Sequence, residues 1–135
     1  MGQDIHGAIE LDYTAKRGEH CLYAMYEYLP RNYLMFGCLA GTRGNTYNTI
    51  KPRGLPDDCD ELIREAFEEE DGHTASWMTA DELAETFTEY ERRWMADPAW
   101  GLTVVEARDV LYRGILATMR AIEMRHPRFV FWFDN

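Results

Sequence analysis

Cysteine is scarce in this sequence, and long apolar runs are missing from it. The three cysteines, Cys21, Cys38 and Cys59, are widely spaced and form no C-x-x-C pair, which argues against a disulfide framework or a zinc knuckle. No apolar stretch approaches the roughly 18 residues needed to cross a bilayer. The opening residues, MGQDIHGAIE, lack the basic and apolar segments of a secretory signal. We therefore expect a cytoplasmic protein with no membrane partner.

Positive charge is also in short supply. The chain has 14 lysines and arginines against 24 aspartates and glutamates, which gives a net charge of -10. Direct binding of nucleic acid needs a broad basic face, so we do not expect it here. The length of 135 residues suits a single domain, 1–135, and a hydrophobic content of 46% is typical of a globular protein.

The charges are distributed unevenly along the chain. Segment 57–71 contains nine acidic residues and one base, Arg64, whereas the preceding segment 41–56 contains three bases and no acid. A solvated helix face explains the acidic segment simply. The alternative is an acidic surface that meets a basic host protein or imitates nucleic acid. Its exposed candidates are Glu61, Glu65, Glu68 and Glu69.

Hydrophobic periodicity and capping signals predict the secondary structure. Strands are expected at 4–13 and 21–28, which form a hairpin, and at 128–133, where both faces are apolar and an inner strand is expected. Helices are expected at 31–40, 57–69, 80–97 and 103–125, and 73–78 reads as a short strand or an extended lead-in. We therefore predict an α+β fold. Its small, mainly antiparallel sheet, built from the N-terminal hairpin and the C-terminal strand, packs with about four helices.

Five segments carry a resemblance to a known family. These are MGQDIH, RNYLMFGCLAG, PRGLPDD, HTASWMTADEL and VFWFDN, in that order along nearly the whole chain. The sequence resembles a family of small uncharacterised proteins of bacteria and their phages that begin MG-x-DIH and end near FWFDN. The resemblance implies a shared fold and a phage or prophage setting, hence the cytoplasm of a bacterial host cell, but it implies no function. Segment 86–124 departs from the family by being longer and more helical.

The polar face of the first strand is the first candidate site. D-x-H on a strand places the carboxylate of Asp4 and the imidazole of His6 on one face. His73 is a further candidate, and Asp134 approaches this face if the first and last strands are neighbours. We assign Asp4, His6 and His73 as candidate catalytic residues and metal ligands. The alternatives are a solvent-facing polar side of an edge hairpin, or a structural histidine that is hydrogen-bonded to Asp4.

The basic segment 41–56 is the second candidate site. Its length is unusual for a loop in a compact domain, and its glycines let backbone N–H groups turn toward an anion. We assign Arg43, Tyr47, Lys51 and Arg53 as candidate ligand-binding residues, with the tyrosine available to stack on a base. Alternatively, the arginines pair with the neighbouring acidic helix. Separately, Trp100 lies in a predicted turn between Pro98 and Gly101 and is a candidate contact residue.

Three functions are compatible with these features. The first is a phage- or prophage-encoded binding protein that engages a nucleotide-like phosphorylated small molecule or a host protein, with counter-defence as one setting. The second is a metal-assisted hydrolase or nucleotide-processing enzyme built on Asp4, His6 and His73, with a divalent metal as cofactor. The third is an acidic interaction protein that mimics nucleic acid. The sequence leaves open whether the chain forms a homo-oligomer.

Overall fold

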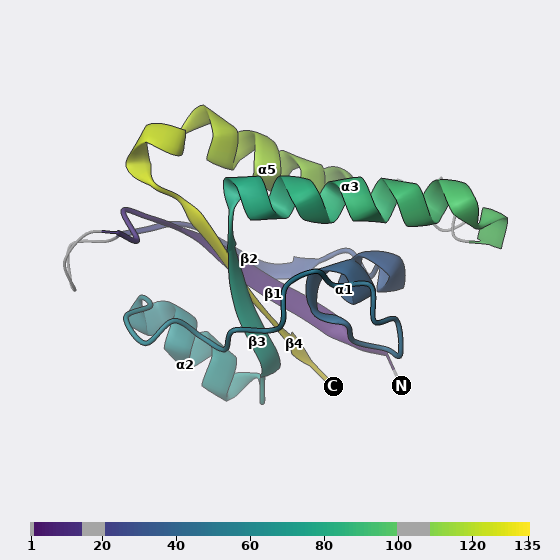
Figure 1. Cartoon of the computed structure of the whole chain (residues 1–135). Coiled ribbons are helices and arrows are strands. Elements are labelled where there is room, and N and C mark those ends of the chain that lie inside the picture. The colour runs from purple at the N-terminus through teal and green to yellow at the C-terminus, as the bar shows by residue number, and fades with distance from the viewer. Residues whose placement is uncertain (1, 15–20, 100–108) are drawn as a thin grey trace.

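The computed structural model describes residues 2–14, 21–99 and 109–135 (Figure 1). Within these ranges the strands are β1 (Asp4–Leu11), β2 (Cys21–Leu29), β3 (His73–Thr79) and β4 (Arg128–Asp134). The helices are α1 (Tyr33–Ala40), α2 (Glu61–Glu69), α3 (Ala80–Ala96) and α5 (Val110–Ala121), and a short 3₁₀ turn covers Glu123–Arg125.

The four strands form one antiparallel sheet in the order β2-β1-β4-β3. The two ends of the chain therefore lie side by side at the centre of the sheet, with Asp4 paired to Asp134 and His6 paired to Trp132. The α+β class and the inner position of the last strand are confirmed. Segment 73–79, for which the sequence left two interpretations open, is the edge strand β3.

Helices cover the two faces of this sheet unequally (Figure 1). The alternating apolar residues of β1 and β4, from Ile5 and Ile9 to Phe129, Phe131 and Phe133, pack with α1, α3 and α5 in the larger core. On the other face, Ala8, Val130 and Trp132 pack against Ile63 of α2 and Cys59 in a smaller core. The polar residues of β1 point to this second face. His6 and Glu10 are therefore fully buried, and they do not face solvent.

Side-chain caps determine where the helices begin. The predicted capping box at Thr79 and Glu82 is present at the start of α3. Helix α2 begins later than the sequence indicated, because Asp60 caps it and not Asp57 or Asp58. The predicted start of the last helix, near residue 103, lies outside the described residues. No helix in the described part of the chain is long and apolar enough to span a membrane.

A buried ion pair joins the second face of the sheet to the segment before α2. Nε of Arg128 lies 2.8 Å from Oε1 of Glu10, and both side chains are almost completely inaccessible to solvent. Nη2 of Arg128 also reaches Asp58 at 3.1 Å, and the backbone N–H of Asp60 donates to the other oxygen of Glu10 at 2.7 Å. Each buried charge therefore has several partners, as burial requires.

Replacing Arg128 with methionine is expected to destabilise the protein strongly, because Glu10 would be left buried without its counter-charge. Urea unfolding should show a loss of about 3–5 kcal/mol. The double variant Glu10→Gln/Arg128→Met should recover part of this loss, since both charges are then absent. Arg125→Ala, which breaks the exposed pair with Asp12, is the control and should leave stability nearly unchanged. An Arg128→Met protein as stable as the control would contradict this account.

Candidate metal centre

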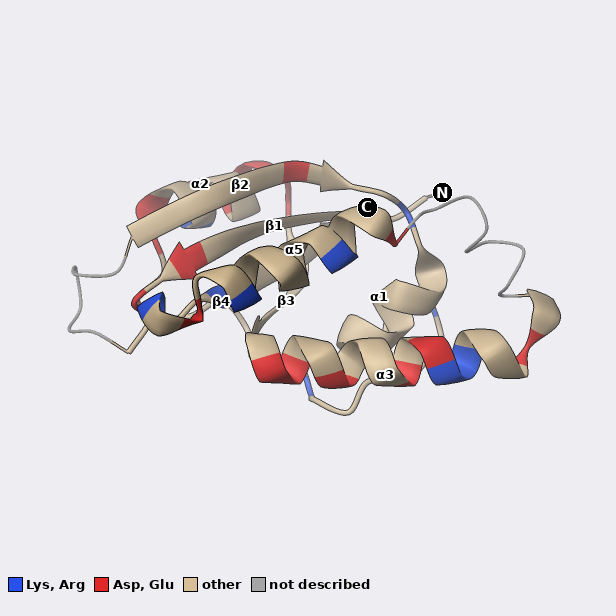
Figure 2. Cartoon of the chain, turned by 90° about the horizontal axis from the view of Figure 1, so that it is seen from above, with Lys and Arg blue, Asp and Glu red and all other residues tan. Residues whose placement is uncertain are grey.

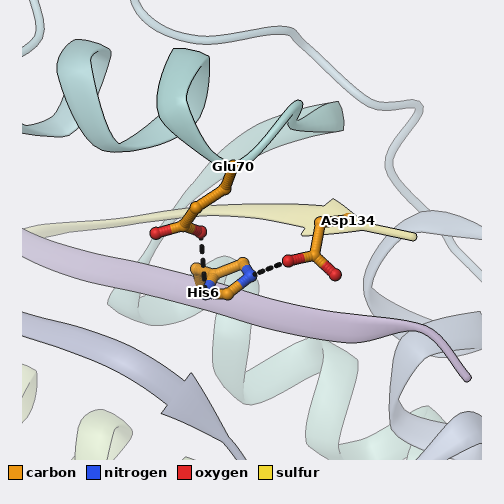
Figure 3. A group of neighbouring side chains, drawn as sticks. All are labelled: His6, Glu70 and Asp134. Atoms are coloured by element: carbon orange, nitrogen blue, oxygen red, sulfur yellow. Dashed lines mark hydrogen bonds and ion pairs between the residues drawn. The ribbon is translucent and has the colours of Figure 1, made fainter.

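His6 lies at the centre of a polar cluster at the end of the sheet where β1 begins and β4 ends (Figure 3). Its side chain is 1% exposed, and each ring nitrogen faces an oxygen atom. Nε2 lies 2.7 Å from Oδ2 of Asp134. Nδ1 lies 2.9 Å from Oε2 of Glu70 and also contacts the backbone carbonyl oxygen of Glu27. Residues of β1, β2 and β4 and of the end of α2 therefore meet at one imidazole.

The local fold explains why these side chains meet. Because β1 and β4 pair antiparallel, His6 and Asp134 lie on adjacent strands and on the same face of the sheet. Glu70 is the C-cap residue of α2, which ends over this face. The turn that follows is tightly packed, since a Cβ atom on Gly72 would clash with Cδ2 of Phe67 and lie 2.9 Å from Cδ1 of Trp132.

Neighbouring groups orient and polarise the cluster. Nε1 of Trp132 donates a hydrogen bond of 3.2 Å to Oε2 of Glu70. Burial raises the pKa of Glu70, and the imidazole of His6 and the Trp132 hydrogen bond oppose that rise. At the edge of the cluster, a hydrogen bond of 2.7 Å from Nε of Arg31 lowers the pKa of Asp4.

Tyr28 borders the same cluster from β2. Its ring centroid lies 4.9 Å from that of His6, and the residue is 59% exposed. Partial desolvation raises the pKa of Tyr28, and the carboxylates of Glu27, Asp134 and Glu70 raise it further. The hydroxyl group of this tyrosine therefore lies within the electrostatic range of the acidic cluster.

The donor atoms of the cluster are those of a metal site. One ligand atom from each of His6, Glu70 and Asp134 can be chosen so that all three lie within 4.8 Å of one another. One imidazole and two carboxylates suit divalent ions such as Zn²⁺ and Mn²⁺. For one ion to contact all three residues, the imidazole or a carboxylate would have to move, because Glu70 lies on the Nδ1 side of the ring and Asp134 on the Nε2 side.

Asp4, His6 and His73, the candidate residues of the first site, have different interaction partners. The structure brings His6 and Asp134 together, as expected for neighbouring first and last strands, and places Asp4 in an ion pair with Arg31. His73 lies on β3, across β4 from His6, where Nε2 is 2.9 Å from Oδ1 of Asn135. The cluster that does form contains Glu70 in place of Asp4 and His73.

Glu70 was not singled out by the sequence analysis. In the sequence it is one of four consecutive acidic residues, 68–71, and nothing in that run distinguishes it from its neighbours. The four acidic interaction candidates, Glu61, Glu65, Glu68 and Glu69, are all exposed in the structure, whereas Glu70 is half-buried. Figure 2 shows that acidic residues also line α3, so the negative surface is not confined to α2. Trp100 lies outside the described residues.

The basic candidates of segment 41–56 do not line one pocket. The guanidinium of Arg43 lies 4.4 Å from the ring centroid of Tyr33. Tyr47 packs against the larger core, with the guanidinium of Arg93 4.2 Å from its ring centroid. Lys51 is exposed. Arg43 and Tyr47 therefore contact residues of α1 and α3, and Lys51 faces solvent.

Arg53 lies beside Trp77, on the face of the sheet that α2 covers. Its guanidinium lies 4.5 Å from the ring centroid of Trp77 and forms two hydrogen bonds with the carboxylate of Glu82. Arg53, Trp77 and Arg128 help to line a surface hollow at the Glu10 end of β1. This hollow and the His6 cluster lie at opposite ends of β1, so the two candidate sites do not combine into one pocket.

Comparisons with protein-family models, with curated proteins and with solved structures returned no match for this chain.

The contact between Arg53 and Glu82 predicts a pH dependence. The hydrogen bond from Arg53 lowers the pKa of Glu82 from its ordinary 4.5, so this pair stabilises the fold above pH 4.5 and loses its effect as the pH falls through the lowered value. The destabilisation caused by Arg53→Ala should therefore be larger at pH 7 than at pH 3.5 in urea unfolding. An equal effect of the substitution at both pH values would contradict this assignment.

Proposed function

We propose that the protein binds a divalent metal ion at His6, Glu70 and Asp134 and uses it for metal-assisted hydrolysis. The convergence of these three side chains from β1, the end of α2 and β4 is the observation that carries the proposal. Segments far apart in the sequence supply the donors, so the cluster is not a by-product of one acidic run.

The backbone supports the imidazole as a ligand. A metal-binding histidine commonly donates its second N–H to a carbonyl oxygen, which fixes the tautomer and orients the ring. Nδ1 of His6 contacts the carbonyl oxygen of Glu27, so a proton on Nδ1 satisfies that acceptor and leaves the lone pair of Nε2 for an ion. Because the side chain is buried between strands, its orientation is fixed before any ion arrives.

The carboxylates supply more negative charge than the protein neutralises locally. Glu70 and Asp134 are both about one-quarter exposed, at 26% and 22%, so an ion can reach them from solvent. Trp132 donates to Glu70, which orients that carboxylate as an outer partner orients a metal ligand. Asp4 adds a further carboxylate at the edge, although Arg31 pairs with it. A divalent cation would offset this accumulation of charge.

Three protein ligands leave coordination positions open for water and substrate, as in catalytic metal sites. A bound ion would lower the pKa of a coordinated water and polarise the bond under attack, with His6, Glu70 and Asp134 as its ligands. In ester hydrolysis the water oxygen bonds to the electrophilic centre, the ester bond breaks, and the leaving oxygen takes the proton that the water gives up.

Metal binding can be measured on protein purified without a polyhistidine tag and stripped with a chelator. Isothermal titration with ZnCl₂ and with MnCl₂ should show one strong site per chain for at least one of the ions. Glu70→Gln and Asp134→Asn preserve shape and remove one charged ligand each. We expect each to weaken binding by about tenfold or more.

Glu69→Gln is the matched control, since Glu69 is adjacent in sequence but exposed. It should bind the ion as the unmodified protein does. The proposal fails if folded, unmodified protein binds neither ion, or if Glu69→Gln weakens binding as much as Glu70→Gln. Circular dichroism of each variant confirms that it is folded.

A further inference from the structure

The surroundings of the cluster point to a substrate class. We infer that the His6–Glu70–Asp134 site acts on phosphate esters, with Arg31 binding the phosphate and Tyr28 contacting the group it esterifies. This inference rests on the proposed metal site. It uses two exposed side chains that are not ligands of the proposed ion. These are Tyr28, near the end of β2, and Arg31, the residue after Pro30.

Arg31 is held at the edge of the cluster in a definite orientation. Its Nε donates to Oδ1 of Asp4 at 2.7 Å, and Asp4 pairs with Asp134 in the strand register. Its guanidinium lies against Gly2, where any Cβ atom would clash with it. Within the described contacts, the carboxylate of Asp4 accepts a hydrogen bond from Nε of the Arg31 guanidinium and none from its Nη groups. About half of this side chain is exposed, so its Nη groups can donate to the oxygens of an anion that approaches from the solvent side, away from Gly2.

Tyr28 offers an exposed aromatic surface beside the same imidazole. Its ring tilts against the ring of His6, and more than half of the residue is accessible to solvent. An aromatic ring at this position can stack on the base of a nucleotide or on an aryl group. Tyr28 thus supplies an aromatic face beside His6, and Arg31 supplies a cation beside Asp4.

The charge of the site makes phosphate binding conditional on the metal. Asp4, Glu27, Glu70 and Asp134 all lie near the hydroxyl of Tyr28, and Arg31 is the cation that pairs within this group. Without an ion, this group of carboxylates repels a phosphate dianion. With a divalent ion bound, the ion and Arg31 together can hold the phosphate oxygens. Phosphate binding that requires a bound metal ion therefore distinguishes this site from an anion pocket made of basic residues alone.

The reaction is balanced without any redox partner. Water oxygen forms a bond to phosphorus, and the bond between phosphorus and the ester oxygen breaks. The electron pair stays on the ester oxygen, which takes one proton from the attacking water. The products are an alcohol and inorganic phosphate, and the ion and the protein return to their starting states.

Binding of phenylphosphonate, which cannot be hydrolysed as an ester, tests the inference. Isothermal titration should detect it when the protein is saturated with Zn²⁺ or Mn²⁺ and not after chelation. Arg31→Ala should weaken this binding by about tenfold or more, because a charge-assisted hydrogen bond is lost. Arg125→Ala is the matched control, since Arg125 also pairs with an aspartate and is 52% exposed, against 49% for Arg31. The control should bind normally.

Tyr28→Ala should weaken phenylphosphonate binding more than Tyr23→Ala, which removes a similarly exposed tyrosine of the same strand. Neither arginine variant should weaken binding of the metal itself. If the metal binds but phenylphosphonate does not, or if Arg31→Ala and Arg125→Ala behave alike, this inference fails and the metal site stands. If no metal binds to the unmodified protein, the proposed function itself fails. Metal-dependent release of nitrophenol from nitrophenyl phosphate, and not from nitrophenyl acetate, would support the reaction class.

Discussion

The burial of a polar strand face under α2 is the constraint on which the rest of this structure depends. Both faces of β1 and β4 are covered, yet one face carries charged and polar side chains between its apolar ones. A buried charge is tolerated only when partners replace water. At one end of β1, Arg128 and backbone groups satisfy Glu10. At the other end, Asp134 and Glu70 converge on His6.

These two ends of the same face differ in chemistry because their charge balance differs. At the Glu10 end the charges are paired, since a buried arginine faces the buried carboxylate and reaches Asp58 as well. The His6 end combines partly exposed carboxylates with one buried imidazole, so negative charge prevails there. The contacts of Arg128 and Glu10 join the segment before α2 to the sheet. The two carboxylates at the His6 end are about one-quarter exposed, so solvent reaches them.

Local signals in the sequence predicted much of the architecture. Alternation placed Asp4 and His6 on one face of the first strand, and the apolar character of both faces placed the last strand inside the sheet. The pairing of Thr79 with Glu82 marked the start of α3 correctly, because a capping box involves neighbouring residues only. The start of α2 was less well defined, since several aspartates precede it and any of them can cap a helix.

The sequence by itself determined the class of fold and which residues of β1 are polar, because both follow from periodicities of a few residues. It also indicated that Asp134 would approach His6 if the first and last strands were paired. Only the tertiary structure decided that Glu70 completes the cluster and that Arg53 lies elsewhere. Those contacts depend on where α2 ends over the sheet and on how segment 41–56 packs. The end of α2 and the packing of segment 41–56 cannot be predicted from the spacing of neighbouring residues, because both result from packing between segments distant in the chain.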